Sequence, residues 1–130
     1  MQNRFTILVT GIGGNVGQGV LRNLKALSDM FILIGVDIGE VTGGHHLCDF
    51  ACQVPYAYDE SYVPLVKDLC VRHGVDLIIP TTDFETYFLS LNASVLPTVA
   101  ASAPEVVGVF LDKFETYLAL NSKGIPFAKT

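Results

Sequence analysis

The sequence RFTILVTGIGGNVGQG, residues 4–19, joins an apolar run to a glycine-rich loop, and it decides the fold. Five glycines fall within the ten residues from Thr10 to Gly19, directly after the run FTILV. A turn with so little side chain, placed between a strand and a helix, lets backbone N–H groups and the helix N-terminus approach an anion. We therefore predict a strand, an anion-binding loop and a helix, in this order.

Length and composition indicate one domain with an unusually apolar surface. The chain has 130 residues, about the length of a single domain. Half of the residues are hydrophobic, and the mean hydropathy is +0.44. A small domain of this kind exposes apolar surface that another unit normally covers, and we expect that unit to be a partner domain outside this sequence.

Charge and apolar run length exclude two classes of partner. The formal net charge is −5 and no cluster of Lys and Arg occurs, whereas nucleic-acid binding needs a basic surface. The longest apolar run, residues 31–36, is far shorter than the roughly 20 residues that cross a bilayer. Three cysteines, an odd number, suit a reducing compartment. We expect a cytoplasmic protein that binds neither nucleic acid nor membrane.

Four apolar runs alternate with helical patterns along the chain. Alternation of this kind predicts parallel strands joined by crossover helices, and consecutive apolar positions indicate burial on both faces of the sheet. We predict a three-layer α/β domain, Rossmann-like in strand order, with a mostly parallel sheet of four or five strands. Residues 38–53 show no clear period and are predicted to form a loop. The predicted strands are RFTILV (4–9), FILIGVD (31–37), VDLIIP (75–80) and LPTVAAS (96–102).

Two amphipathic helices are predicted to pack on this sheet. The first carries its apolar stripe on Val16, Val20, Leu24 and Leu27. On the second helix, Cys70 and His73 share the stripe, so we interpret both as packing residues and not as ligands. The stripe of the second helix is Tyr62, Leu65, Val66, Leu69, Cys70 and His73.

Three capping boxes predict helix starts in the second half of the chain. They are TDFE (82–85), SAPE (102–105) and DKFE (112–115), each a short polar residue followed three positions later by Glu. The last helix is predicted to end at KGIP, where Gly124 can adopt a left-handed cap and Pro126 blocks continuation. The final residues FAKT (127–130) are typical of the opening of another strand.

The spacing of Gly11, Gly14 and Gly17 resembles that of the extended short-chain dehydrogenases, which bind a nicotinamide dinucleotide. Asp37 follows Gly17 by 20 residues, where a ribose-binding acid would stand. These enzymes also use a Tyr-x-x-x-Lys pair, in which Lys lowers the pKa of Tyr. No tyrosine here has Lys four residues on, since those positions hold Glu60, Tyr62, Val66, Leu91 and Asn121. An NAD(P)-binding domain is therefore an alternative hypothesis.

A second resemblance covers nearly the whole chain. LDKFETYLALNSKGIPFAKT (111–130) resembles the segment that ends the N-terminal domain of ATP-grasp enzymes, in which Asp-Lys opens a helix and Gly-Ile-Pro-x-x-x-Thr leads into the ATP-binding domains. Together with IIPTTDFET (78–86) and ILVTGIGGNVGQG (7–19), the chain is similar to the pre-ATP-grasp domain of a carbamoyl-phosphate synthase large-subunit-like protein. The resemblance ends where the catalytic domains would begin.

The resemblance implies an ATP-dependent carboxylate-amine ligase. In such enzymes ATP phosphorylates a carboxylate, with Mg²⁺ between the phosphates, and an amine or ammonia displaces phosphate from the acyl phosphate. It implies that Lys113 contacts an ATP phosphate and that two loops face the substrate. The implied substrate and anion contacts are Gly11, Gly13, Gly14, Asn15, Gly17, Asp37, Thr81, Thr82, Asp83 and Glu85.

We expect residues 1–130 to be a substrate-side domain that precedes the ATP-grasp domains of the same chain. The catalytic residues, the ATP site apart from Lys113, and the Mg²⁺ site are then expected outside this segment, which should be inactive alone. The partners implied are ATP, a small carboxylate substrate and the missing domains. The sequence does not determine whether the protein forms a homodimer, which acceptor substrate it uses, or what donates the nitrogen. A third hypothesis for the function is a non-catalytic ligand-binding module.

Several of these residues also have a purely structural explanation. Asp83 and Glu85 can serve only as a helix start, with Glu85 bonding back to the Thr82 backbone. Asp37 can simply end a strand, Lys113 can be a solvated first-turn residue, and the glycine loop can be a tight turn. A cluster of His and Cys suggests zinc, but its ligands would crowd on one short loop. For this cluster, His45, His46, Cys48 and Cys52, we expect no metal but a loop beside the substrate cleft.

Overall fold

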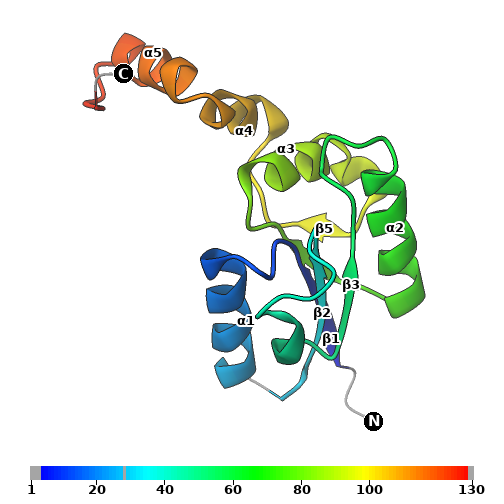
Figure 1. Ribbon diagram of the computed structural model, residues 1–130. Coiled ribbons are helices and arrows are strands. Elements are labelled where there is room, and N and C mark those ends of the chain that lie inside the picture. The colour runs from blue at the N-terminus through cyan, green and yellow to red at the C-terminus, as the bar shows by residue number, and fades with distance from the viewer. Residues whose placement is uncertain (1–3, 28, 129–130) are drawn as a thin grey trace.

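The computed structural model describes residues 4–27 and 29–128 as one five-stranded sheet flanked by helices. All four strand pairings are parallel, and the strand order is β3-β2-β1-β4-β5 (Figure 1). The predicted three-layer, Rossmann-like α/β fold is confirmed. The strands are β1 (Phe5–Val9), β2 (Phe31–Asp37), β3 (Phe50–Gln53), β4 (Leu77–Ile79) and β5 (Thr98–Val99).

Two hydrophobic layers hold the sheet between its helices. On one face, Ile7, Val9 and Leu33 pack under α1 (Asn15–Leu27) and the short 3₁₀ helix η1 (His45–Leu47). On the other face, strand residues such as Leu8 and Ile78 pack against α2 (Tyr62–His73) and α3 (Asp83–Leu91). Burial on both faces explains the consecutive apolar positions in the central strands.

Strand β3 lies inside the segment that the sequence predicted as loop. Its two end residues are exposed and its two middle residues are half-buried, and it forms one edge of the sheet beside β2. A short edge strand has little apolar side chain to bury, so no run of hydrophobic residues marks it. The loop proper is confined to the residues between β2 and β3, with η1 in its middle.

Helix α1 forms where predicted, and half of its predicted stripe packs on the sheet. Val20 and Leu24 pack against the hydrophobic layer on this face, whereas Val16 and Leu27 are 62% and 75% exposed. Gly17 and Leu21 are the buried residues of the helix. A Cβ at Gly17 would overlap the backbone carbonyl of Gly11, so the helix rests directly on the loop. Since a glycine adds nothing to an apolar period, the sequence pattern did not mark Gly17.

The second amphipathic helix and its end agree better with the prediction. Tyr62, Val66, Leu69 and Cys70 of α2 are buried in the core, while the ring of His73 packs on Phe50 at a centroid distance of 4.4 Å. Gly74 ends the helix in the left-handed region with φ 61°. Cys70 therefore serves packing, and burial raises the pKa of its thiol to about 11.

The two predicted capping boxes at residues 102–105 and 112–115 differ in outcome. Asp112 caps α5 (Lys113–Ser122) by accepting hydrogen bonds from the Phe114 and Glu115 N–H groups, and Gly124 follows the helix at φ 69° as predicted. The helix α4 (Pro104–Leu111) instead has Ala103 at its N-cap with no side-chain bond, because Pro104 occupies its first turn.

Helices α4 and α5 leave the body of the domain as a projecting arm (Figure 1). Helix α4 packs on α3, and α5 packs on α4. Thr116 is the one residue of α5 that is buried, and its hydroxyl donates to the Val109 and Asp112 carbonyls. Of the strand predicted at FAKT, Phe127 and Ala128 lie in no strand, and residues 129 and 130 fall outside the described part.

Among the helices of the described residues, none combines the length and apolar character that a membrane crossing requires.

The contact beneath Gly17 gives a test of the fold. We expect Gly17→Ala to lower the free energy of unfolding by about 1–3 kcal/mol, because the new methyl group would overlap the Gly11 backbone. Gly19 lies in the same helix with nothing within 4 Å of a Cβ position, so Gly19→Ala should raise it by about 0.5–1 kcal/mol. Urea denaturation of both variants measures the difference, and equal effects would contradict the packing described.

Candidate functional site

A cleft of about 590 Å³ opens at the carboxyl ends of the parallel strands. Four segments line it, and they follow β1, β2, β3 and β4. Strand order reverses between β1 and β4, since the first crossover leads to β2 on one side and β4 lies on the other. Open α/β sheets bind ligands at such a point. The lining residues are Gly11, Gly13, Gly14, Asp37, Ile38, Val41, Thr42, Tyr56, Ala57, Tyr58, Thr82, Phe84 and Glu85.

The glycine loop forms the floor of the cleft and is closely packed. Gly11 has φ 57°, and a Cβ there would lie 2.8 Å from the Thr81 hydroxyl oxygen. The Gly14 N–H donates to the Gly11 carbonyl over 3.1 Å, which closes a tight turn. Both a positive φ and the lack of room make glycine the residue that fits at position 11.

Asp37, at the end of β2, holds the neighbouring loops in place. Its Oδ2 accepts from the Gly13 N–H over 2.7 Å, and its Oδ1 accepts from the Gly39 N–H over 2.8 Å. The carboxyl group is 8% exposed and lines the cleft. Asp37 therefore does more than end a strand, because it joins the glycine loop to the segment after β2.

Glu85 is a second carboxyl group in the cleft, buried in the first turn of α3. Its Oε1 accepts from the Tyr62 hydroxyl over 3.0 Å, and its Oε2 accepts from the Thr82 hydroxyl over 2.7 Å. The Thr82 hydroxyl in turn caps the helix by accepting from the Glu85 N–H. The sequence predicted a bond from Glu85 back to the Thr82 backbone; the carboxylate bonds to the Thr82 hydroxyl and turns inward instead.

The surroundings of Glu85 favour its neutral form. Burial raises the pKa of this carboxyl, hydrogen bonds from the Thr82, Thr10 and Tyr62 hydroxyls oppose the rise, and the charge of Asp37 adds to it. Burial and the charge of Glu85 likewise raise the pKa of Tyr62. The tyrosine below the cleft is thus held protonated and acts as a hydrogen-bond donor.

Three aromatic rings form an exposed wall of the cleft. Tyr56 and Tyr58 stack with an interplanar angle of 7° at 5.3 Å, and Phe84 meets Tyr58 edge to face at 6.3 Å. They are 55%, 62% and 56% exposed. We call these three residues the aromatic wall. Isolated exposed rings are ordinary, but three that gather on one cleft form a contact surface.

The structure brings together six of the residues that the sequence singled out for the substrate. Gly11, Gly13, Gly14, Asp37, Thr82 and Glu85 all line the cleft. Thr81 lies behind the lining, where its hydroxyl donates to the Thr10 carbonyl over 2.7 Å. Gly17 is buried beneath the loop, Asn15 begins α1, and Asp83 faces a separate depression beside α4.

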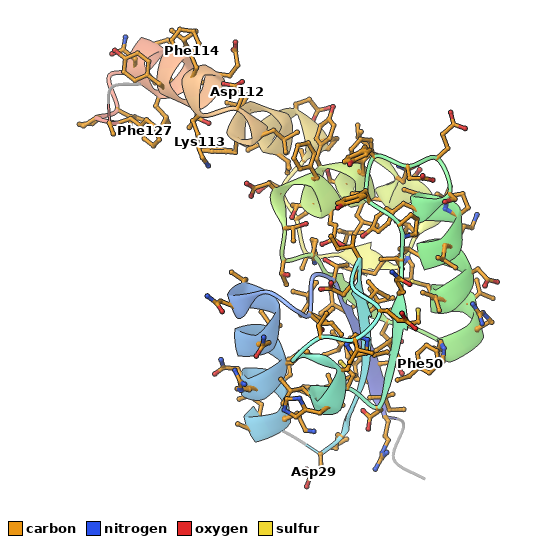
Figure 2. The ribbon with its side chains drawn as sticks, viewed as in Figure 1. Asp29, Phe50, Asp112, Lys113, Phe114 and Phe127 are labelled. Atoms are coloured by element: carbon orange, nitrogen blue, oxygen red, sulfur yellow. The ribbon has the colours of Figure 1, made fainter. Side chains whose placement is uncertain are left out.

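Lys113 lies apart from the cleft. It is the first residue of α5 and projects from the arm together with Asp112 (Figure 2). Its side chain is exposed, so it can contact only a group that approaches the arm from outside the domain.

The histidines and cysteines after β2 serve the local structure. His45 Nδ1 accepts from the Thr42 N–H over 2.9 Å, and the Cys48 thiol contacts the Gly44 carbonyl. Burial and the charge of Asp49 raise the pKa of Cys48 to about 11, which disfavours the thiolate. In the described part of the chain no three His, Cys, Asp or Glu side chains gather as metal ligands would. Through Thr42, His45 positions one rim of the cleft.

Comparison with known proteins relates this geometry to enzymes of established structure. No protein-family model and no curated protein matches the sequence. Solved structures match over nearly all of it. The N5-carboxyaminoimidazole ribonucleotide synthetase from Thermotoga maritima aligns with a TM-score of 0.70 at 18% identity, over 96% of this chain and 32% of that protein.

Two further structures agree. The biotin carboxylase domain of the Hydrogenobacter thermophilus 2-oxoglutarate carboxylase, a dimer in complex with MgADP, ADP and bicarbonate, has a TM-score of 0.68 at 18% identity over 95% of this chain and 28% of that chain. Glycinamide-RNase-transformylase T from Mycobacterium tuberculosis has a TM-score of 0.69 at 16% identity over 95% and 37%. This chain shares its fold with a segment of each of these proteins.

The shared segment includes nearly all of this chain but only part of each of these proteins. The chain spans about a third of the length of these proteins. With 95–96% of the chain aligned, at most a few residues are left out, so the aligned span must include the α4–α5 arm. The arm is thus part of the shared fold.

Sequence reasoning missed the apolar half of the cleft. Ile38 and Val41 come from the segment without a period, and Tyr56 and Tyr58 from the turn that leads into α2. Phe84 stood inside a motif interpreted for its Thr, Asp and Glu. The one available signal in the sequence was that these three aromatic residues lie within or beside loops. They form a shared wall only because β3 and β4 belong to one sheet, which brings the two loops together.

The raised pKa of Glu85 predicts a specific pH dependence of stability. Because the native carboxyl binds its proton more tightly than the unfolded one, stability is lost as the pH rises from about 4.3 through the native pKa. The variant Glu85→Gln lacks this titration. As the pH rises from about 4.3 through the native pKa of Glu85, the unfolding free energy of the natural protein minus that of the variant should therefore fall. The fall is about 1.4 kcal/mol per unit of pKa difference. Urea denaturation across the window measures it, and a difference independent of pH would contradict the prediction.

Proposed function

We propose that this chain is the N-terminal, substrate-side domain of an ATP-dependent carboxylate-amine ligase of the ATP-grasp type, similar to the carbamoyl-phosphate synthase large subunit. In the proposed reaction a carboxylate oxygen attacks the γ-phosphorus of ATP and ADP leaves. The amine nitrogen then attacks the acyl carbon, inorganic phosphate leaves, and the nitrogen loses a proton. The domain described here contributes the cleft at the carboxyl ends of the strands.

One observation carries the proposal: the aligned span includes both the sheet and the arm. A dinucleotide-binding sheet alone would account for β1 to β5 but not for two further helices that project from it. The alignments that span sheet and arm have TM-scores of 0.68 to 0.70, and the proteins are a ribonucleotide synthetase, a biotin carboxylase domain in complex with MgADP, ADP and bicarbonate, and a transformylase. In the sequence, the same arm carries the Asp-Lys and Gly-Ile-Pro motifs.

The surface of the arm fits a role as the contact to further domains. Phe110, Phe114, Leu118, Ile125 and Phe127 are each between 42% and 52% exposed. They add apolar surface to a segment whose main contact with the rest of the described chain is the packing of α4 on α3. Covering such a surface is favourable by roughly 25 cal/mol per Å² of apolar area. We propose that ATP-grasp domains of the same protein cover it.

Lys113 is the residue of this domain that we propose to contact ATP. It is exposed at the start of α5, where the helix dipole also favours a phosphate. We assign no step to a metal held by this domain, because the described residues form no metal-ligand cluster. The proposed Mg²⁺ ligands therefore belong to the ATP-grasp domains.

Isotope transfer tests the proposed reaction. In the protein that joins this domain to its ATP-grasp domains, a substrate labelled with ¹⁸O in its carboxylate should yield labelled inorganic phosphate, because the carboxylate oxygen stays with phosphorus when the acyl phosphate breaks down. Mass spectrometry of the released phosphate measures the label. Unlabelled phosphate would contradict the acyl phosphate. The 130-residue chain alone should release no phosphate from MgATP, and enzyme-like hydrolysis by it would refute this division of roles.

Two lysines at opposite ends of α5 test the ATP contact. In the same joined protein, Lys113→Ala should raise the KM for ATP by about tenfold or more, since it removes a charged partner of a phosphate. Lys123→Ala removes an equally exposed charge at the other end of α5 and should leave that KM unchanged. Steady-state kinetics with varied ATP compare them, and equal effects would exclude a local contact at Lys113.

The alternative of an NAD(P)-dependent dehydrogenase has less support. Its glycine spacing and Asp37 are present, but Asp37 already binds two backbone N–H groups. Burial and then the charge of Glu85 raise the pKa of Tyr62, whereas a dehydrogenase tyrosine needs a lowered one. Titration with NADH and NADPH, followed by cofactor fluorescence, should show no saturable binding, and tight saturable binding would favour the dehydrogenase.

A further inference from the structure

The charge of the cleft is the first of three observations on its ligand. Among its lining residues, all within the described part of the chain, the charged side chains are Asp37 and Glu85, and no Lys, Arg or His is present. The two carboxyl groups are close enough for the charge of Asp37 to act on Glu85. A ligand with a negative group here would be repelled by one or both of them.

The second observation is that the glycine loop offers few free donors to the cleft. Of the three glycines that line it, Gly13 donates its N–H to Asp37 and Gly14 donates its N–H to the Gly11 carbonyl. Acceptors are more plentiful, because a carboxylate offers about four lone-pair positions. Asp37 uses two of these on backbone N–H groups, and Glu85 uses two on the hydroxyl groups of Tyr62 and Thr82.

The aromatic wall is the third observation. The rings of Tyr56 and Tyr58 are stacked in nearly parallel planes, and these two residues and Phe84 are each more than half exposed. Ile38 and Val41 add apolar surface from the segment after β2. Such a surface favours a flat, apolar group, and the faces of the tyrosine rings also attract a cation.

We propose that the cleft binds the amine substrate of the ligase, a molecule with a planar ring and a protonated or neutral amine, and that the carboxylate substrate binds elsewhere. This inference rests on the proposed function and specifies which of the two substrates this domain selects. The ring lies against the aromatic wall, and the amine donates to the remaining lone pairs of Asp37 and Glu85. An amine bound in this way is positioned before it attacks, and a protonated amine first loses its proton to solvent so that the neutral nitrogen forms the new bond.

Matched indole probes test the chemistry of the cleft in the 130-residue chain itself. Tryptamine and indole-3-propionate share a ring and a two-carbon side chain but end in an ammonium and a carboxylate. The chain contains no Trp, so indole fluorescence reports the probe alone. We expect tryptamine to bind saturably and at least about tenfold more tightly than indole-3-propionate, as charge-assisted hydrogen bonds require. Equal affinity, or tighter binding of the carboxylate, would overturn the inference.

Two variants locate the binding and one serves as control. Tyr58→Ala should weaken tryptamine binding by about threefold to tenfold, because it removes a ring from the wall. Glu85→Gln, which preserves size, should reduce the preference for tryptamine over indole-3-propionate. Phe114→Ala removes an equally exposed ring on the arm and should change neither value. If Phe114→Ala weakens binding as much as Tyr58→Ala does, the probe is not in the cleft and the inference fails.

Failure of the amine-binding inference can be distinguished from failure of the ligase proposal, because binding of the indole probes requires neither ATP nor the ATP-grasp domains. Tryptamine binding that depends on Tyr58 supports an amine ligand, whether or not ¹⁸O reaches phosphate. Absence of ¹⁸O in the phosphate would refute only the ligase proposal. Conversely, ¹⁸O transfer without selective tryptamine binding leaves the ligase in place and overturns the assignment of the amine to this cleft.

Discussion

The contact between Gly17 and the carbonyl of Gly11 is the constraint on which the rest of the structure depends. A side chain at position 17 would occupy the space of the loop backbone, so only glycine lets α1 rest directly on the turn after β1. That close approach fixes α1 over Ile7 and Val9 on one face of the sheet. It also fixes Gly11 beside Thr82 and Glu85, and Gly13 beside Asp37. The floor of the cleft is therefore set by backbone packing.

The two carboxyl groups in the cleft combine structural and chemical roles. Asp37 joins the loops after β1 and β2, and Glu85 joins the start of α3 to Tyr62 of α2. Buried carboxyl groups are tolerated when hydrogen bonds satisfy them, and here backbone N–H groups and hydroxyls do so. Because these partners leave some acceptor capacity unused, the same groups remain able to receive donors from a ligand. A glycine loop commonly associated with anions thus lies beside acidic side chains, and the balance between them decides what the cleft binds.

The sequence predicted much of the fold and part of the site, and the residues show why the rest was missed. Consecutive apolar residues marked β1 and β2 because both their faces are buried, whereas β3 at the sheet edge has no such run. The inward face of α1 was predicted only in part, through Val20 and Leu24, because Gly17 has no side chain to contribute to a period. Glu85 was identified from a capping motif, but its burial against Tyr62 depends on α2 and α3 meeting on the same face of the sheet. The aromatic wall was missed because its members come from two separate loops.

By itself, the sequence determined four of the five strands and the helices between them, the glycine turn, the capped start and glycine-terminated end of α5, and the likeness to ATP-grasp N-terminal domains. These properties depend on residues near one another in the chain, where periodicity, capping and turn chemistry act. Only the tertiary structure decided which faces are buried, that four loops converge into one cleft, and that its charged groups are both acidic. The physical reason is that parallel strands, joined by helices of ten or so residues, bring their carboxyl ends together only when the sheet is assembled.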